Sequence, residues 1–432
     1  MLSGRTLRTG LITALILSTL TVAEAAGPKA GSSCPKVGTK EVFKGKTFTC
    51  IKSGKKLVWN NGVLVVAAAK PSPTPTPSLS PSTSASTAPV PTQTPSPTAT
   101  PSATPTPSYP STPSQAPTPT STPTSFDDLF EKRSGISFAA WRRSSEIIQA
   151  NRAKFGILEI YTGPNSKPYF DEYPIAVGLV SRLFPGRAEP VKTIVIRFKY
   201  VDLDWADATF KEKFGESQYQ QMNTTENGRL VPSQCNASTK NCTNSMQQTS
   251  NQGISLILQG IQNTDDPNDA TGKMRFYSGM LEAHEYFHAL QRIPIMGKSN
   301  IWPHAWFREG GAEWVQNVAI NFQDFKTYTD YLRLDCAYEC QRISEADIAE
   351  FLQTAKENYL PSKFPQWLNY SLGAYVIEAL VSLKGPDTLI EMYAQMGNQI
   401  SFNQAFKNTY GVDWSYAIPI LAKTIYANLK GL

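Results

Sequence analysis

The sequence has no long apolar segment of the kind that membrane-spanning proteins need, and one long stretch of it has no charged residues. Apart from residues 11–22 no segment approaches the length of a membrane span, and even that apolar run is too short to cross a bilayer comfortably. Residues 71–125 contain no Asp, Glu, Lys or Arg and consist almost entirely of Pro, Thr, Ser and Ala. Because such a composition cannot bury a core, it predicts a disordered, extended linker of up to ~170 Å.

A secretory signal is predicted at residues 1–26. Arg5 and Arg8 form its charged start, residues 11–22 its apolar centre and residues 23–25 a small-residue cleavage site. The protein is therefore expected to be secreted into the extracellular space or held at the cell envelope, with no transmembrane span after cleavage.

Cysteine usage agrees with export. No CxxC pair is present, which argues against a cysteine-based metal site, and an even number of cysteines in an exported chain favours disulfides. The six residues form three local pairs, Cys34/Cys50, Cys235/Cys242 and Cys336/Cys340. A bond within the third pair is tight if its segment is helical, so cross-pairing with the second pair stays open.

The net charge of +6 is distributed unevenly along the chain. Residues 27–70 carry nine Lys and one Glu, whereas residues 126–432 have a net charge of −3. The larger segment therefore gives no support to nucleic-acid binding. For the Lys-rich segment two interpretations stand, attachment to an anionic cell-wall or envelope polymer and a merely solvated basic face.

The same segment, residues 27–70, is predicted to fold as a small β module. Two alternating runs flank Ser53-Gly54, which is typical of a hairpin turn. So short a module needs a covalent staple, and a Cys34–Cys50 disulfide would provide one.

Residues 126–432 are long enough for a sizeable core and predict an α+β fold. A strand-containing lobe at 126–270, with strands near 191–201 and 253–261, precedes a mainly helical lobe at 271–432. The polar residues 217–252 are interpreted as a long surface insertion. Helices are expected at 276–291, 309–321, 343–358, 369–384, 387–396 and 414–429.

Two of only three histidines in the chain are four positions apart, His284 and His288, with Glu285 between them. On a helix, residues four apart lie one above the other, so both imidazoles can bind one ion. This is the HExxH arrangement, in which two neutral histidines hold Zn²⁺ and the glutamate acts as general base. The pattern predicts one catalytic zinc ion.

A catalytic zinc needs a third protein ligand and an open position for water. Glu309 lies 21 positions after His288 at the start of the next expected helix, and Glu313, one turn later, could support a ligand imidazole. His304 is the competing third ligand, but a His₃ site of the HExxHxxGxxH type needs a Gly and a His where Gln291 and Pro294 stand. Glu309 is therefore favoured, and His304 is interpreted as a structural residue near the cleft or a donor to the transition state.

HEYFH at 284–288 followed by WFREGGAE at 306–313 resembles the gluzincin metallopeptidases, a group with aminopeptidase N-like and thermolysin-like members. Residues 369–377 (NYSLGAYVI) resemble the Y-x-x-G-A-x-V segment of the aminopeptidase N branch. The resemblance covers roughly residues 250–432.

This resemblance implies a zincin-like fold with zinc bound by His284, His288 and Glu309. It also implies that Glu285 deprotonates the attacking water and that Tyr370 donates to the oxyanion. By analogy of fold alone, the strand at 254–261 would be the sheet edge that pairs with a peptide or protein substrate.

One departure affects the expected activity. The Gly-x-Met-Glu-Asn signature that anchors a free substrate N-terminus in aminopeptidases of this group is absent. An exported zinc endopeptidase is therefore expected rather than an aminopeptidase. The alternatives are a non-catalytic wall-associated binding protein on a peptidase-like scaffold and a zinc amidase that acts on wall peptides.

Overall fold

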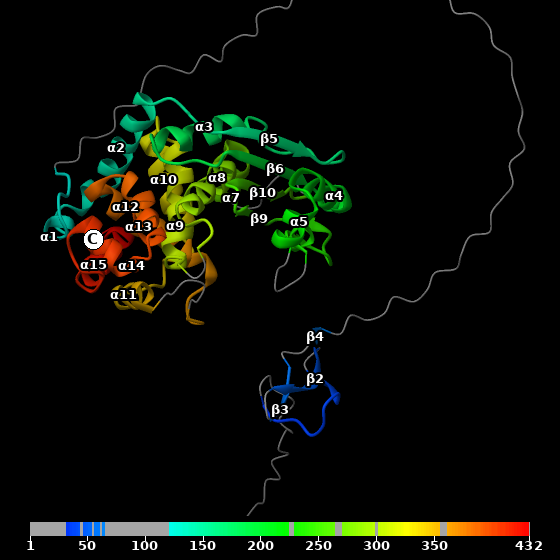
Figure 1. Cartoon of the computed structure of the whole chain (residues 1–432). Coiled ribbons are helices and arrows are strands. Elements are labelled where there is room, and N and C mark those ends of the chain that lie inside the picture. The colour runs from blue at the N-terminus through cyan, green and yellow to red at the C-terminus, as the bar shows by residue number, and fades with distance from the viewer. Residues whose placement is uncertain are drawn as a thin grey trace, which may run out of the picture. The chain divides into compact units, whose positions relative to one another are not determined.

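The computed structural model describes residues 32–43, 46–53, 56–60, 63–64, 121–223, 229–263, 270–298, 301–354 and 361–431. They belong to two compact units, a small one within residues 1–104 and a large one within residues 105–432 (Figure 1). The predicted signal at 1–26 and residues 71–120 of the predicted linker lie outside the described residues. Within the described ranges, no helix is long and apolar enough to cross a membrane.

The small unit is an antiparallel sheet closed by a disulfide. Its strands are β1 (Lys40–Phe43), β2 (Lys46–Ser53), β3 (Lys56–Trp59) and β4 (Val63–Leu64). Cys34 is bonded to Cys50, and Phe48, Cys50 and Trp59 form the small buried core. The predicted disulfide-bonded β module is thus confirmed. Its exposed lysines include Lys36, Lys40, Lys52 and Lys56.

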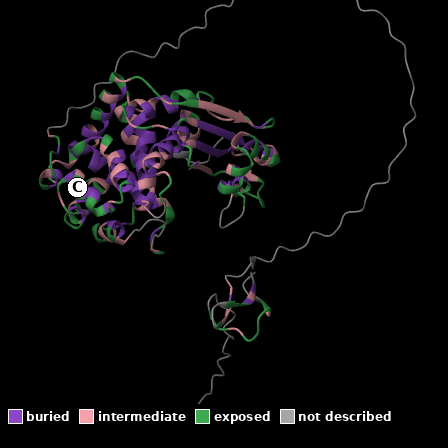
Figure 2. Ribbon diagram, in the orientation of Figure 1, coloured by how far each residue is buried: buried purple, intermediate pink, exposed green. Residues whose placement is uncertain are grey.

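The large unit contains a four-stranded sheet with the order β5-β6-β10-β9 (Figure 1). The strands are β5 (Ile157–Thr162), β6 (Lys192–Phe198), β9 (Ser245–Thr249) and β10 (Ile254–Gly260). β5, β6 and β10 are parallel, and β9 runs antiparallel to β10. Helices α3 (Tyr173–Leu183) and α8 (Met280–Arg292) cover one face, and α4 (Leu203–Phe214) covers the other. The two strands buried on both faces, β6 and β10, each carry three consecutive apolar residues at their centre, 194–196 and 256–258 (Figure 2).

The sheet corrects one prediction. The strand at 254–261 is not the edge, because β10 pairs with β6 on one side and with β9 on the other. The edges are β5 and β9, and β9, the edge beside β10, lies inside the segment 217–252 that was interpreted as a surface insertion. The described residues of that segment also include most of α5 (Glu216–Met222) and all of α6 (Leu230–Ser233), β7 (Cys235–Asn236) and β8 (Asn241–Cys242).

The second part of the large unit is mainly helical, as predicted. It comprises α7 (Ala270–Ser278), α8, α9 (Ala305–Ile320), α10 (Phe325–Cys336), α11 (Glu345–Thr354), α12 (Ser371–Lys384), α13 (Asp387–Gly397), α14 (Phe402–Tyr410) and α15 (Trp414–Lys430). Two earlier helices, α1 (Phe126–Leu129) and α2 (Ile136–Ala150), pack against this part as well. The hydrophobic core of the helical part therefore contains residues from both the beginning and the end of the large unit. Short 3₁₀ turns lie at Arg133–Gly135, Tyr200–Asp202, Ile293–Ile295 and Gln366–Asn369.

The single helix predicted at 276–291 is two helices. α7 ends at Ser278, Gly279 has a φ of +91°, and α8 begins at Met280. A Cβ at Gly279 would lie 2.7 Å from the Phe170 ring, so only glycine suits both the backbone conformation and the space. α7 and α8 are therefore separate helices, and they pack against each other.

α9 and α12 cross at two glycines. A Cβ built on Gly310 would lie 2.4 Å from the backbone carbon of Gly373, and one on Gly373 would lie 2.7 Å from the Trp306 carbonyl oxygen. The two backbones are therefore in direct contact, and any side chain at the crossing would push the helices apart.

All three disulfides join the local pairs. Cys235 is bonded to Cys242 across the β7–β8 ladder, and Cys336, the last residue of α10, is bonded to Cys340. Cross-pairing between these two pairs is thereby excluded. Three disulfides fit a protein of an oxidising, extracytoplasmic environment.

A buried carboxyl group joins four helices of the core. Glu378 of α12 accepts hydrogen bonds from Tyr328 of α10 (2.6 Å) and Ser137 of α2 (3.0 Å), and Trp314 of α9 donates to the Tyr328 oxygen (2.8 Å). Burial raises the pKa of Glu378 to about 7, although both hydrogen bonds act in the opposite direction. The folded chain therefore keeps this carboxyl protonated in weakly acidic solution.

The stability of the large unit should consequently fall as the pH rises. In the unfolded chain Glu378 ionises near 4.5, and in the folded chain near 7, so folding binds a proton between these values. The stabilisation is complete below 4.5 and lost above about 7, where the difference corresponds to about 3 kcal/mol. Glu378→Gln should flatten this decline in chemical denaturation measured from pH 4.5 to 8. Glu345→Gln, at an exposed position, should leave the decline as it is, and the same slope in both variants would contradict the assignment.

Candidate metal centre

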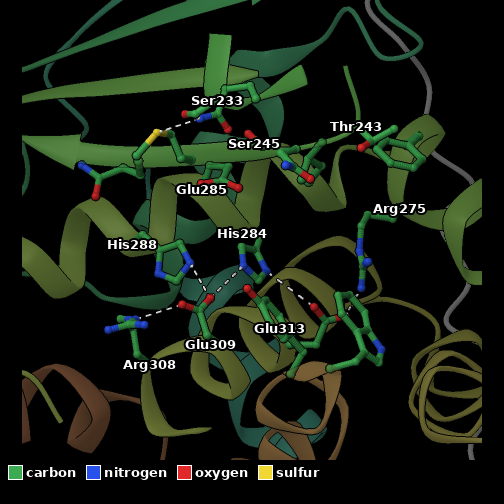
Figure 3. A pocket seen from close by; sticks show the side chains of 18 of the residues that line it. Ser233, Thr243, Ser245, Arg275, His284, Glu285, His288, Arg308, Glu309 and Glu313 are labelled. Atoms are coloured by element: carbon green, nitrogen blue, oxygen red, sulfur yellow. Dashed lines mark hydrogen bonds and ion pairs between the residues drawn. The ribbon is translucent and has the colours of Figure 1, made fainter. Parts of the chain in front are cut away.

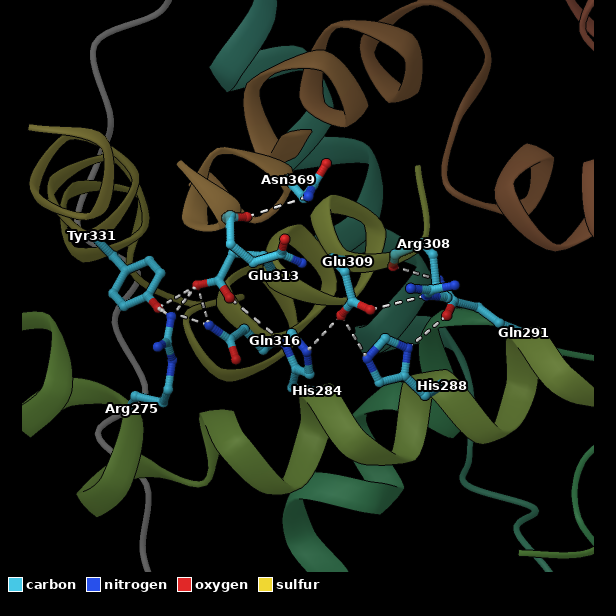
Figure 4. A network of polar contacts seen from close by, with 11 residues as sticks. Arg275, His284, His288, Gln291, Arg308, Glu309, Glu313, Gln316, Tyr331 and Asn369 are labelled. Carbon is cyan, nitrogen blue, oxygen red and sulfur yellow. Dashed lines mark hydrogen bonds and ion pairs between the residues drawn. The ribbon is translucent and has the colours of Figure 1, made fainter. Parts of the chain in front are cut away.

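Two imidazoles project from one side of α8. His284 and His288 lie one turn apart, and their ring centroids are 4.8 Å from each other. α8 packs under the sheet and against α9, and its two histidines point towards α9 (Figure 4). Helical spacing therefore places them as the sequence predicted.

α9 provides the third group. It begins at Ala305, which brings Glu309 to its first turns and opposite the histidines. Glu309 Oε2 lies 3.1 Å from His288 Nε2 and 3.8 Å from His284 Nε2. One ligand atom from each of the three residues lies within 4.8 Å of the other two, so this group could hold a metal ion. Two imidazoles and one carboxylate are the donor set of an open zinc site.

The structure places a supporting residue behind each histidine. Glu313 Oε2 lies 3.6 Å from His284 Nδ1, at the imidazole that the sequence predicted it could support. His288 Nδ1 shares a hydrogen bond of 2.8 Å with Gln291 Oε1, and the Gln291 amide donates to the Arg308 carbonyl oxygen (2.9 Å). Each Nδ1 thus has an oxygen partner, which directs the Nε2 lone pairs towards Glu309. Gln291 was missed by the sequence reasoning, where it counted only as a departure from a three-histidine pattern.

The charges of the group depend on one another. Burial opposes the ionisation of Glu309, but the neighbouring His288, hydrogen bonds from both histidines and the Arg308 guanidinium hold the pKa of Glu309 well below its usual range. Burial likewise opposes the charging of His288, yet the carboxylate of Glu309 raises the pKa of His288. A metal ion would take the place of that proton, because a ligating imidazole has to be neutral.

Glu285 lies between the histidines in sequence and faces the same cavity (Figure 3). Only 5% of its surface is exposed, and its Oε2 has no hydrogen-bond partner. Burial raises the pKa of Glu285, and the charge of Glu309 adds to this, against the two histidines and a hydrogen bond with Ser245. A buried carboxyl with an unused oxygen beside a metal-binding group is suited to accept a proton.

Tyr370 also reaches the cavity, at the start of α12. Its ring stacks on the His284 ring, with centroids 5.9 Å apart and an interplanar angle of 16°, and on Trp367 at 4.6 Å and 11°. Burial, helped by the charges of Glu309 and Glu285, raises the pKa of Tyr370, so its hydroxyl stays a proton donor at neutral pH.

His304 lies elsewhere. It caps the start of α9, with its ring edge-on to Phe402 at 4.6 Å and stacked on Trp306 at 5.9 Å. It belongs neither to the metal-binding group nor to the lining of the cavity, as far as the described residues go. The structure thus brings Glu309, and not His304, to the histidines.

The cavity above the histidines has a volume of about 600 Å³. β9 contributes Ser245, Met246 and Gln247 to its lining, and Trp367 and Tyr370 line it as well. Figure 3 shows Glu285 on the β9 side of this space and Glu309 below the histidines. A ligand in the cavity would contact the metal-binding group and the sheet edge together.

No family model, curated protein or solved structure matches this chain. The resemblance to gluzincins therefore rests on the motifs themselves and on the side-chain arrangement around His284.

Metal analysis tests the assignment of the ligands. The purified chain should bind about one zinc ion, and His284→Ala, His288→Ala and Glu309→Ala should each weaken binding by orders of magnitude, because each removes one of only three protein ligands. His304→Gln is the matched control and should keep the metal. Mass spectrometry of the protein and competition with a chelating indicator give the stoichiometry and the affinity. Loss of zinc in His304→Gln alone would refute Glu309 as third ligand.

Proposed function

We propose that this chain is an exported zinc-dependent peptidase that cleaves within peptide chains. The observation that carries the proposal is the convergence of His284, His288 and Glu309 beside Glu285 in one open cavity. A binding protein would need no buried carboxyl with an unused oxygen at this place. A bound zinc ion would supply Lewis acidity towards a carbonyl oxygen and would make water more acidic.

The residues of the chain take complementary parts in the proposed hydrolysis. Glu285 accepts the proton of the attacking water and passes it to the leaving amine. Tyr370 donates its hydroxyl proton in a hydrogen bond to the carbonyl oxygen as negative charge develops there. Glu313 and Gln291 keep the two imidazoles oriented throughout.

The edge strand β9 is proposed to align the substrate. Ser250 N donates to Ile254 O and Gly260 N donates to Asn244 O, so the even-numbered residues of β9 face β10. In an antiparallel ladder the backbone groups of Ser245, Gln247 and Thr249 then point to the open edge. An extended peptide can pair there as an additional strand.

Internal cleavage is favoured over removal of single N-terminal residues. The carboxylates that line the cavity are Glu285, Glu309 and Glu313, within the described residues. Glu309 and Glu313 lie beside the histidines, and Glu285 has the proposed role of proton acceptor. None of the three is therefore left to bind the ammonium group of a substrate N-terminus. This agrees with the missing aminopeptidase signature. Export and attachment through the Lys-rich unit stay predictions.

Glu285→Gln separates metal binding from catalysis. The variant should bind zinc as the wild type does but cleave an unfolded protein more slowly by about 10²–10⁴-fold, because the amide cannot accept the proton. Glu282→Gln, one turn earlier on α8 and bonded to Gln259 outside the cavity lining, is the matched control and should stay active. Cleavage is followed by mass spectrometry of the products. Wild-type chain that binds zinc but cuts only wall peptides would establish the amidase instead, and zinc binding without any cleavage would establish the non-catalytic scaffold.

Gln247→Pro tests the role of β9. Proline removes an N–H that points to the open edge and that the β9–β10 ladder does not use. KM for a peptide should rise roughly tenfold, the worth of one hydrogen bond, with unchanged zinc affinity and melting temperature. Gln247→Ala keeps the N–H and should retain the wild-type KM. An equal rise of KM in both variants would show that the side chain matters and the backbone does not.

A further inference from the structure

Arg275 of α7 is a buried cation that no sequence motif singled out. Its side chain is 15% exposed and lies one turn before the break at Gly279. Its Nη2 donates to Glu313 Oε1 at 2.6 Å and to the Tyr331 hydroxyl at 2.9 Å (Figure 4). Asp335 lies 3.5 Å from the same nitrogen. Although burial acts against it, these neighbouring charges raise the pKa of Arg275, so the guanidinium stays charged.

A first connection leads from Arg275 to a zinc ligand. Glu313 Oε1 accepts hydrogen bonds from Arg275, from Tyr331 (2.5 Å) and from Gln316 (2.5 Å). Its Oε2 has no hydrogen bond and lies 3.6 Å from His284 Nδ1. The three donors therefore fix the carboxylate by one oxygen and leave the other directed at His284. An oriented carboxylate selects the tautomer whose Nε2 can bind metal.

A second connection leads from Arg275 to the tyrosine above the metal group. The guanidinium carbon lies 4.7 Å from the centroid of the Trp367 ring, in a cation–π contact. Trp367 stacks on Tyr370, and Tyr370 stacks on His284. A guanidinium, an indole, a phenol and an imidazole thus form one continuous stack.

Arginine suits this place because its planar group can bond and stack at once. The N–H edge meets Glu313 while the ring of Trp367 contacts the guanidinium. A lysine could keep the ion pair but offers no flat surface to the indole. A methionine would lose both contacts and leave the two carboxylates of Glu313 and Asp335 without this cation.

We propose that Arg275 is a positioning residue that holds the zinc ligand His284 and the oxyanion donor Tyr370 in one geometry, through Glu313 and through Trp367. The part that concerns Tyr370 rests on the proposed peptidase function, whereas the part that concerns His284 requires only that the chain binds zinc. The substitutions that separate the two connections are Arg275→Lys, which spares the ion pair, and Arg275→Met, which spares neither.

The experiment measures zinc affinity and peptide cleavage in the full chain. Arg275→Met and Glu313→Gln should each weaken zinc binding by about 10–100-fold, and the double variant should be no weaker than the worse of the two. Arg275→Lys should bind zinc as tightly as the wild type. At saturating zinc, Arg275→Lys and Trp367→Leu should both lower kcat with little change in KM, again without an additive effect when combined.

Controls keep this proposal distinct from the function it builds on. Arg182→Met changes a partly buried arginine that lies outside the metal cavity and should alter neither readout. Melting temperatures of the metal-free variants identify a loss of fold, in which case Arg275→Lys carries the test. Wild-type chain without zinc would refute the proposed function. Three outcomes would refute the positioning role. They are wild-type zinc affinity in a folded Arg275→Met variant, additive effects of Arg275→Met and Glu313→Gln on zinc affinity, and an unchanged kcat in Arg275→Lys.

Discussion

The contact between the α9 and α12 backbones at Gly310 and Gly373 is the constraint on which the centre depends. Glu309 directly precedes the first glycine, and Tyr370 lies one turn before the second. Because no side chain separates the helices there, a carboxylate of α9 and a phenol of α12 reach the same imidazole, that of His284. A methyl group at the crossing would have to displace backbone. The positions of Glu309 and Tyr370 beside His284 therefore depend on glycine at both Gly310 and Gly373.

Buried carboxylates in the centre are paired with arginine side chains. Each carboxylate near the histidines has a cation or several donors assigned to one of its oxygens: Arg308 for Glu309, and Arg275 for Glu313. Glu285 differs from both in having no arginine partner among the described residues, although Glu285 and Glu313 each keep one oxygen without a hydrogen bond; it is the carboxyl that the proposed mechanism assigns as proton acceptor. Burying an unsatisfied carboxyl costs stability. For Glu285 that cost falls on the residue to which the proposed function assigns the proton transfer.

The sequence predicted those parts of the fold and the centre that follow from local spacing. Four-residue spacing determines how His284 and His288 face one ion, and the need of a small module for a staple predicted Cys34–Cys50. The pairing of the other four cysteines stayed open until the structure placed them. The break at Gly279 and the contacts of Arg275 have no local signature, since they depend on Phe170 and Glu313, which are far away in the chain. The edge of the sheet was missed for another reason. β9 has the sequence Ser-Met-Gln-Gln-Thr, a polar run with weak strand preference, whereas β10 carries the apolar run Leu-Ile-Leu at its centre, which is typical of a central strand.

The polar sequence of β9 has a consequence for self-association. An open sheet edge invites pairing with any other exposed strand, including that of a second copy, and proteins blunt such edges with polar residues or by covering them. Here the edge carries half-buried serine and glutamine side chains and forms a wall of a cavity that Trp302 and Tyr370 also line. A strand still attached to its own sheet would bring its neighbouring strands against these aromatic side chains. The aromatic side chains beside β9 therefore oppose edge-to-edge pairing with another sheet, that of a second copy included.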